Sequence, residues 1–99
     1  MCVDHWQALE PLAAPIRHEV FVEEQQVPAA LEMDEMDAVC LHALARSDTG
    51  EGIGTGRLLP DGHIGRMAVC KPWRGQGVGS ALLKALMAAA HDRGDAEVV

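Results

Sequence analysis

The sequence predicts one α/β domain of the α+β kind, with a mixed, mostly antiparallel sheet flanked by helices. Three strand patterns follow one another between residues 38 and 70, with short turns between them. A helical pattern precedes these strands, and a longer one follows a glycine-rich turn after the last strand. At 99 residues the chain has room for a single core, so we expect one domain over residues 1–99.

The first third of the chain is expected to hold a short strand at residues 2–7 and a helix at residues 10–25. Three apolar residues at helical spacing form the buried face of this helix: Leu12, Ile16 and Val20. Arg17 and Glu24 then lie on its other faces, available for contacts. The acidic segment at residues 27–37 is expected to be a loop or short helix with solvated carboxylates.

The middle of the chain is expected to form an antiparallel meander. Its strands are placed at residues 38–46, 52–59 and 63–70. The tight turns between them make each strand antiparallel to its neighbour. Three glycines are assigned to one face of the middle strand: Gly52, Gly54 and Gly56. Glycine weakens a strand, so this face indicates that another backbone or a ligand approaches closely.

A long helix is predicted at residues 77–93, with Gly94 as its C-terminal stop. Its apolar stripe is expected to consist of Leu82, Leu83, Leu86, Met87 and Ala90. Another strand is expected to begin at residues 96–99.

The composition favours a soluble cytoplasmic protein. The 8 basic and 15 acidic residues give a net charge of −7, which argues against nucleic acid or an anionic membrane as the main partner. The sequence has no apolar run long enough to span a bilayer, and no signal peptide is expected. Cys2, Cys40 and Cys70 form no CxxC pair, so we expect buried, reduced thiols. The histidines lack metal-ligand spacing, and no metal is predicted.

The glycine-rich turn before the last helix has the composition of a phosphate cradle. Gly75, Gly77 and Gly79 leave the backbone amides open to an anion, and Arg74 adds a charged donor. The helix that follows directs its first N–H groups and the positive end of its dipole to the same place. The spacing does not fit the dinucleotide fingerprint G-x-G-x-x-G, because Ser80 stands where the third glycine is required.

The segment Arg74-Gly-Gln-Gly-Val-Gly79 resembles the Arg/Gln-x-x-Gly-x-Gly/Ala motif of the GNAT superfamily of N-acetyltransferases. The chain is similar to the ElaA-like branch of that superfamily over roughly residues 6–99, also through residues 16–25, 34–37 and 56–62. The resemblance implies a GNAT-like acyl-CoA N-acyltransferase fold without its C-terminal third. We therefore expect a fragment, with completion of the sheet by a partner chain as the alternative.

The same resemblance implies acetyl-CoA as cofactor and an amine of a small molecule or protein as acceptor. It assigns the pyrophosphate to the amides of Arg74, Gly75, Gln76, Gly77, Val78, Gly79 and Ser80. It assigns the pantetheine arm to the splayed strand at Met67, Ala68 and Val69. A backbone N–H at or near Met67 or Val69 would then stabilise the oxyanion.

Many family members use a tyrosine as the acid that protonates the departing thiolate, and this chain has no tyrosine. Glu24 is the first choice for the base, followed by Asp37 and His42. Arg57 and Arg66 either contact substrate or pair with the acidic segment. Two alternatives stay open: a binding module without chemistry, and a homodimer formed through an open sheet edge at residues 96–99.

Overall fold

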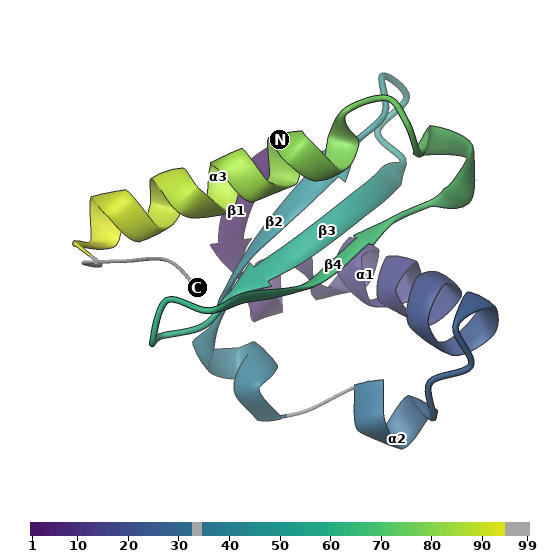
Figure 1. Ribbon diagram of the computed structural model, residues 1–99, viewed down its shortest axis with the longest axis horizontal. Helices are drawn as coiled ribbons and strands as arrows, with labels where there is room; N and C mark the ends of the chain where they lie inside the picture. The colour runs from purple at the N-terminus through teal and green to yellow at the C-terminus, as the bar shows by residue number, and fades with distance from the viewer. Residues whose placement is uncertain (33–34, 95–99) are drawn as a thin grey trace.

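A computed structural model describes residues 1–32 and 35–94, and Figure 1 shows an antiparallel sheet with a helix on each face. The sheet has four strands in the order β1-β2-β3-β4, each antiparallel to its neighbour. The strands are β1 (Cys2–His5), β2 (Leu41–Arg46), β3 (Gly52–Leu58) and β4 (Ile64–Val69). The predicted fold class is confirmed, while the strand expected at residues 96–99 lies outside the described residues.

Two long helices cover the sheet, α1 (Trp6–Arg17) on one face and α3 (Val78–Arg93) on the other (Figure 1). Their apolar residues form two clusters separated by the strands. The α1 side buries Leu9, Ala13, Ile16, Val20, Leu44 and Ala68. The α3 side buries Ala43, Ala45, Ile53, Leu58, Leu82, Leu86 and Ala90. The single core expected from the length is thus divided by the sheet into two clusters, one under each helix.

The first helix begins earlier than the sequence predicted. β1 ends at His5 and α1 starts at Trp6, whereas the sequence placed the start at residue 10. No side chain caps this start, so the usual polar signal for a helix N-terminus is missing. The chain continues from α1 into a π-helix, η1 (His18–Glu24), which the periodicity did not distinguish from α-helix.

Short helical segments form most of the acidic segment, which agrees with the short-helix alternative, and they replace the start of the second predicted strand. They are α2 (Ala29–Glu32) and the 3₁₀ helix η2 (Glu35–Val39), so β2 starts at Leu41 instead of residue 38. The expectation of solvated carboxylates is wrong for Glu32 and Asp37, which are only 4% and 2% exposed. Both carboxylates are buried because arginines from α1 and β3 contact them, as described below.

The three glycines of β3 do not share a face. The β2–β3 register shifts next to Arg46, so Gly52 faces α1 while Gly54 and Gly56 face α3. A Cβ added at Gly54 would lie 3.0 Å from Leu82 Cδ1. The predicted close approach therefore exists, and both core side chains and backbone make it, since the Cβ added at Gly54 would also lie 3.3 Å from Ala68 O.

The long helix agrees closely with its prediction. Gly77 and Gly94 bound it in the left-handed region, with φ of +83° and +90°. Of the predicted stripe, Leu82, Leu86 and Ala90 are buried. Leu83 and Met87 are 41% and 47% exposed, so the prediction wrongly included these two residues in the buried stripe. Positions four apart stay on one helix face, and this face alone meets the sheet.

β4 is the edge strand of the described sheet, and it is bulged. Its register against β3 shifts between Thr55 and Arg57, and Arg66 adopts a left-handed φ of +49°. Of the cysteines, Cys40 is buried and Cys70 is half-buried, while Cys2 is exposed, contrary to the prediction for it. Within residues 1–32 and 35–94, no helix has the length and apolar character needed to cross a bilayer.

Candidate functional site

The glycine-rich turn joins β4 to α3 through a 3₁₀ turn, η3 (Lys71–Trp73). Gly75 and Gly77 have φ of +80° and +83°, which L side chains rarely adopt, and a Cβ at either would meet no atom within 4 Å. The glycines are thus required by the backbone turn, and the space above them is open. A side chain here would stand in the place an anion would occupy.

The first turn of α3 offers free amides to that space. The first bond of the helix ladder runs from Ala81 N to Gly77 O, 3.0 Å, so the N–H groups of Val78, Gly79 and Ser80 precede it. Gly77 is the N-cap residue and supplies no side-chain acceptor. Several uncapped N–H groups at the positive end of the helix dipole suit a phosphate group.

The outer edge of β4 leads directly to this turn. Cys70 N donates to Ile53 O at 2.9 Å, so Cys70 faces β3. The backbone groups of an antiparallel strand alternate between its two edges, so the N–H and C=O of Val69 face the open edge. Arg74 Nε donates to Val69 O at 2.9 Å, which agrees with this direction. Met67 lies in the bulged segment, and its side chain packs on the α3 side of the sheet.

An ion pair ties the glycine turn to the end of η1. Arg74 Nη2 donates to Glu24 Oε1 and Arg74 Nη1 lies against Glu24 Oε2, each at 3.0 Å. The side chains are 42% and 30% exposed. The structure thus brings together the first-choice base and the arginine predicted to bind phosphate, although 50 residues separate them in the sequence. No pattern in the sequence indicates this pairing.

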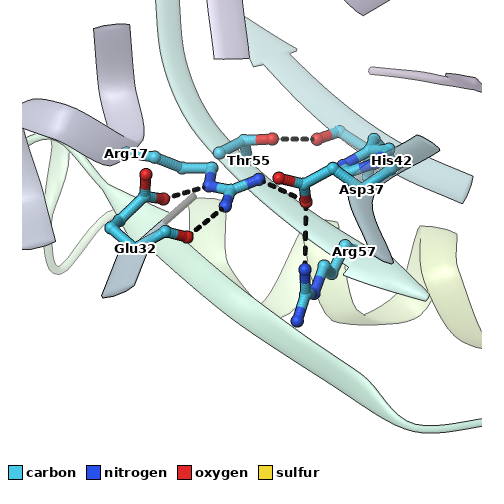
Figure 2. Close-up of polar contacts among 7 residues, drawn as sticks. Arg17, Glu32, Asp37, His42, Thr55 and Arg57 are labelled. Atoms are coloured by element: carbon cyan, nitrogen blue, oxygen red, sulfur yellow. Dashed lines mark hydrogen bonds and ion pairs between the residues drawn. The ribbon is translucent and has the colours of Figure 1, made fainter. Parts of the chain in front are cut away.

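A buried ion cluster of Arg17, Glu32, Asp37 and Arg57 lies on the α1 side of the sheet (Figure 2). Arg17 contacts the Glu32 carboxylate through Nε and donates from Nη2 to Glu32 O at 2.9 Å. Asp37 Oδ1 accepts from Arg17 Nη1 at 2.7 Å and from Arg57 Nη1 at 3.0 Å. Two cations and two anions balance, as buried charges require. Of the two roles left open for Arg57, pairing with the acidic segment is the one observed.

His42 lies beside this cluster. Its Nε2 donates to Asp37 O at 3.0 Å, and the Trp6 ring covers it with a centroid separation of 4.7 Å. Burial lowers the pKa of His42 below its ordinary 6.5, the leading effect, although the Asp37 carbonyl and carboxylate act in the opposite direction. Asp37 and His42 are thus enclosed, and of the three residues considered as a base only Glu24 is open to solvent.

Within residues 1–32 and 35–94, the remaining reactive groups include one thiol close to a carboxylate. Burial, the largest cause, and the neighbouring Glu19 carboxylate together raise the pKa of the Cys70 thiol to about 11, so the thiol stays protonated. Among the described residues, no three His, Cys, Asp or Glu side chains are grouped so that they could hold a metal ion.

Sequence reasoning did not find the roles of Arg17 and Glu32. A signal was present: Arg17 directly follows the buried Ile16 in α1, and an acidic segment comes soon after the helix. A cation beside the apolar face of a helix is seldom buried unless it is paired. The combination therefore pointed to a buried pair.

Comparison with known proteins gives consistent results. The family model described as "Acetyltransferase (GNAT) family" matches residues 6–99. The uncharacterized N-acetyltransferase YjcF of Bacillus subtilis is 42% identical over 82 residues, which cover 80% of this chain and 58% of YjcF. The chain thus spans less than two thirds of the length of this curated relative.

Solved structures show the same architecture. An acyl-CoA N-acyltransferase from Pseudomonas aeruginosa superposes with a TM-score of 0.81 at 31% identity, covering 94% of this chain and 70% of that one. Escherichia coli ElaA superposes with a TM-score of 0.83 at 24% identity, covering 97% of this chain and 72% of its own. The fold, the open glycine turn and the matched family model agree, and the chain belongs to the GNAT family of acetyltransferases.

Proposed function

We propose that this chain binds acetyl-CoA and, in its complete form, transfers the acetyl group to an amine of a small molecule or protein. The observation that carries this proposal is the uncapped N-terminus of α3 behind the open turn at Gly75 and Gly77, next to the open edge of β4. The similar protein from Pseudomonas aeruginosa is an acyl-CoA N-acyltransferase, which supports a cofactor of this class.

The described residues fit such a cofactor. The amides from Arg74 to Ser80 would bind the pyrophosphate, since the space in front of the glycines is unfilled. The edge of β4 from Met67 to Val69 would pair with the amide-containing pantetheine arm, as with an added strand. When bound, acetyl-CoA supplies an activated acetyl thioester.

The chain's own groups would then orient the acceptor and stabilise charge. A backbone N–H at Met67 or Val69 would donate to the carbonyl oxygen as negative charge develops on it. Glu24 would accept a proton from the acceptor amine, since its carboxylate is partly exposed beside the glycine turn. The net charge of −7 attracts a cationic amine to the protein.

Isothermal titration with acetyl-CoA tests the cofactor assignment, with Gly77→Val as the decisive variant. Valine at this position would fill the open space, so we expect affinity to fall at least about tenfold, the loss of a few phosphate hydrogen bonds. Gly94→Val is the matched control, because its φ of +90° imposes a similar strain at the far end of α3 and no atom lies within 4 Å of its added Cβ.

The control variant should bind like the wild-type chain, while both variants lose similar stability in urea denaturation. Absence of binding by the folded wild-type chain, or equal affinity of Gly77→Val, would refute the proposal. A second candidate is an acyl-CoA-binding module without turnover. Binding without thiol release from acetyl-CoA, across a panel of amines, would support that candidate over the enzyme.

A further inference from the structure

We propose that Glu24 and the cofactor pyrophosphate compete for Arg74, so that cofactor binding releases the Glu24 carboxylate toward the acceptor amine. This inference rests on the proposed function, since it concerns how the same site is controlled. Arg74 is then a positioning residue that couples binding of the pyrophosphate at the glycine turn to the availability of Glu24 as a base.

The first argument is the way in which Arg74 is occupied. Both terminal nitrogens of its guanidinium contact the Glu24 carboxylate at 3.0 Å, in the two-point geometry that carboxylate and phosphate share. Its Nε is held by Val69 O at 2.9 Å. The Arg74 side chain therefore lies along the β4 edge and occupies Val69 O. This carbonyl is one of the groups with which an added strand or a pantetheine arm would pair.

The second argument is energetic. The side chains of Arg74 and Glu24 are 42% and 30% exposed. Solvent-exposed ion pairs of this kind contribute about 0–1 kcal/mol to the stability of the fold. A pyrophosphate carries more charge than a carboxylate and would be bound by the α3 amides at the same time. A guanidinium binds phosphate oxygens as readily as carboxylate oxygens. The cofactor would therefore win the competition, and like-charge repulsion would move Glu24 away from it.

The consequence is an order of events. Without cofactor, Arg74 restrains the proposed base. With pyrophosphate on the turn, the carboxylate at the end of η1 becomes free to accept a proton. The base is then more available when the cofactor is bound, which favours binding of the acetyl donor before the acceptor amine is engaged.

The test is a double-mutant cycle on acetyl-CoA affinity, measured by isothermal titration at low salt on the full chain. Glu24→Gln keeps the shape of the side chain and removes its charge, so we expect about two- to fivefold tighter binding, the size of an exposed ion pair. Glu23→Gln is the matched control, because Glu23 is the adjacent residue, is 63% exposed and pairs with His18 instead. It removes one charge from the same turn without freeing Arg74.

The cycle is completed by Arg74→Gln, alone and together with Glu24→Gln. The inference requires that Glu24→Gln tighten binding more than Glu23→Gln does, and that this surplus vanish in the Arg74→Gln background. Weaker or unchanged binding by Glu24→Gln, an equal effect of Glu23→Gln, or a surplus that persists without Arg74 would each overturn it. If the folded wild-type chain does not bind acetyl-CoA, the proposed function itself fails, an outcome separate from these three.

Discussion

Asp37 holds two arginines from different elements on a single carboxylate oxygen. Its Oδ1 accepts from Arg17 of α1 and Arg57 of β3, while the residue is only 2% exposed. Removing one member of a buried ion pair leaves an uncompensated charge in the interior. Asp37 therefore stabilises the packing of α1 and η2 against the sheet.

We predict that Asp37→Asn lowers the free energy of unfolding by about 3 kcal/mol, because two guanidiniums lose their shared counterion. Urea denaturation at neutral pH measures the change. Asp48→Asn provides the comparison: Asp48 is an exposed carboxylate in the β2–β3 turn, and its replacement should stay within about 0.5 kcal/mol of wild type. Equal stabilities of the two variants would show that the buried ion cluster does not stabilise the fold.

At this scale, sequence reasoning succeeded where backbone conformation determines residue type. Gly77 and Gly94 require positive φ, so they mark the ends of α3 in the sequence itself. It failed for Asp37 and Glu32, because the burial of a carboxylate depends on which distant arginine reaches it. The sequence indicated a buried partner for Arg17 in the acidic segment, but the spacing does not show which carboxylates of that segment reach it.

Among the elements, β3 shows most clearly how residue size and packing are connected. A Cβ added at Gly56 would collide with Met67 Sδ and lie 3.0 Å from Leu86 Cδ1. The absence of a side chain at Gly56 thus lets α3 and the bulged β4 approach the middle of the sheet. The position of α3 matters because its N-terminus forms the proposed phosphate site.

We predict that Gly56→Ala destabilises the protein by about 1–3 kcal/mol, the usual cost of overpacking a core. Gly65→Ala is the matched control on the adjacent strand, since its added Cβ meets no atom within 4 Å and its φ is not in the positive range. Thermal and urea unfolding of both variants measure the difference. A Gly56→Ala protein as stable as Gly65→Ala would contradict the close approach of α3.

Elements were predicted in type more reliably than in extent. The meander and α3 follow from turn residues and periodicity, and both were found. α1 begins four residues before its predicted start. The prediction missed this start because His5, the extended residue before Trp6, provides no side-chain cap. The predicted face of Gly52 was wrong because the register shift next to Arg46 inverts the alternation of side chains between the two faces of the sheet. A bulge of this kind has no simple signature in one sequence.

At the scale of the whole molecule, the two faces of the sheet have different roles. The α3 face is an apolar core that fixes the glycine turn, whereas the α1 face encloses the buried ion cluster and His42. His42 connects this arrangement to pH, because it is buried among Trp6, Asp37 and two arginines. Protonation of its ring would add a third positive charge beside the buried ion cluster, whose two arginines and two carboxylates already balance.

We predict that stability falls as the pH falls below about 6.5, and that His42 accounts for much of the loss. The folded state depresses the pKa of His42, so the unfolded chain takes up a proton near the ordinary value of 6.5 while the folded chain does not. Stability therefore increases with pH wherever the unfolded state binds more protons. For one group the slope reaches at most about 1.4 kcal/mol per pH unit.

Urea denaturation between pH 7.5 and 5.5 measures this slope, and His42→Gln should reduce it because glutamine can still donate to Asp37 O without titrating. His91→Gln is the control, since His91 is exposed near the end of α3, and this variant should keep the wild-type slope. All other titratable groups are the same in the three proteins, so the comparison isolates the two histidines. An undiminished slope in His42→Gln would mean that groups other than this buried histidine make the fold sensitive to acid.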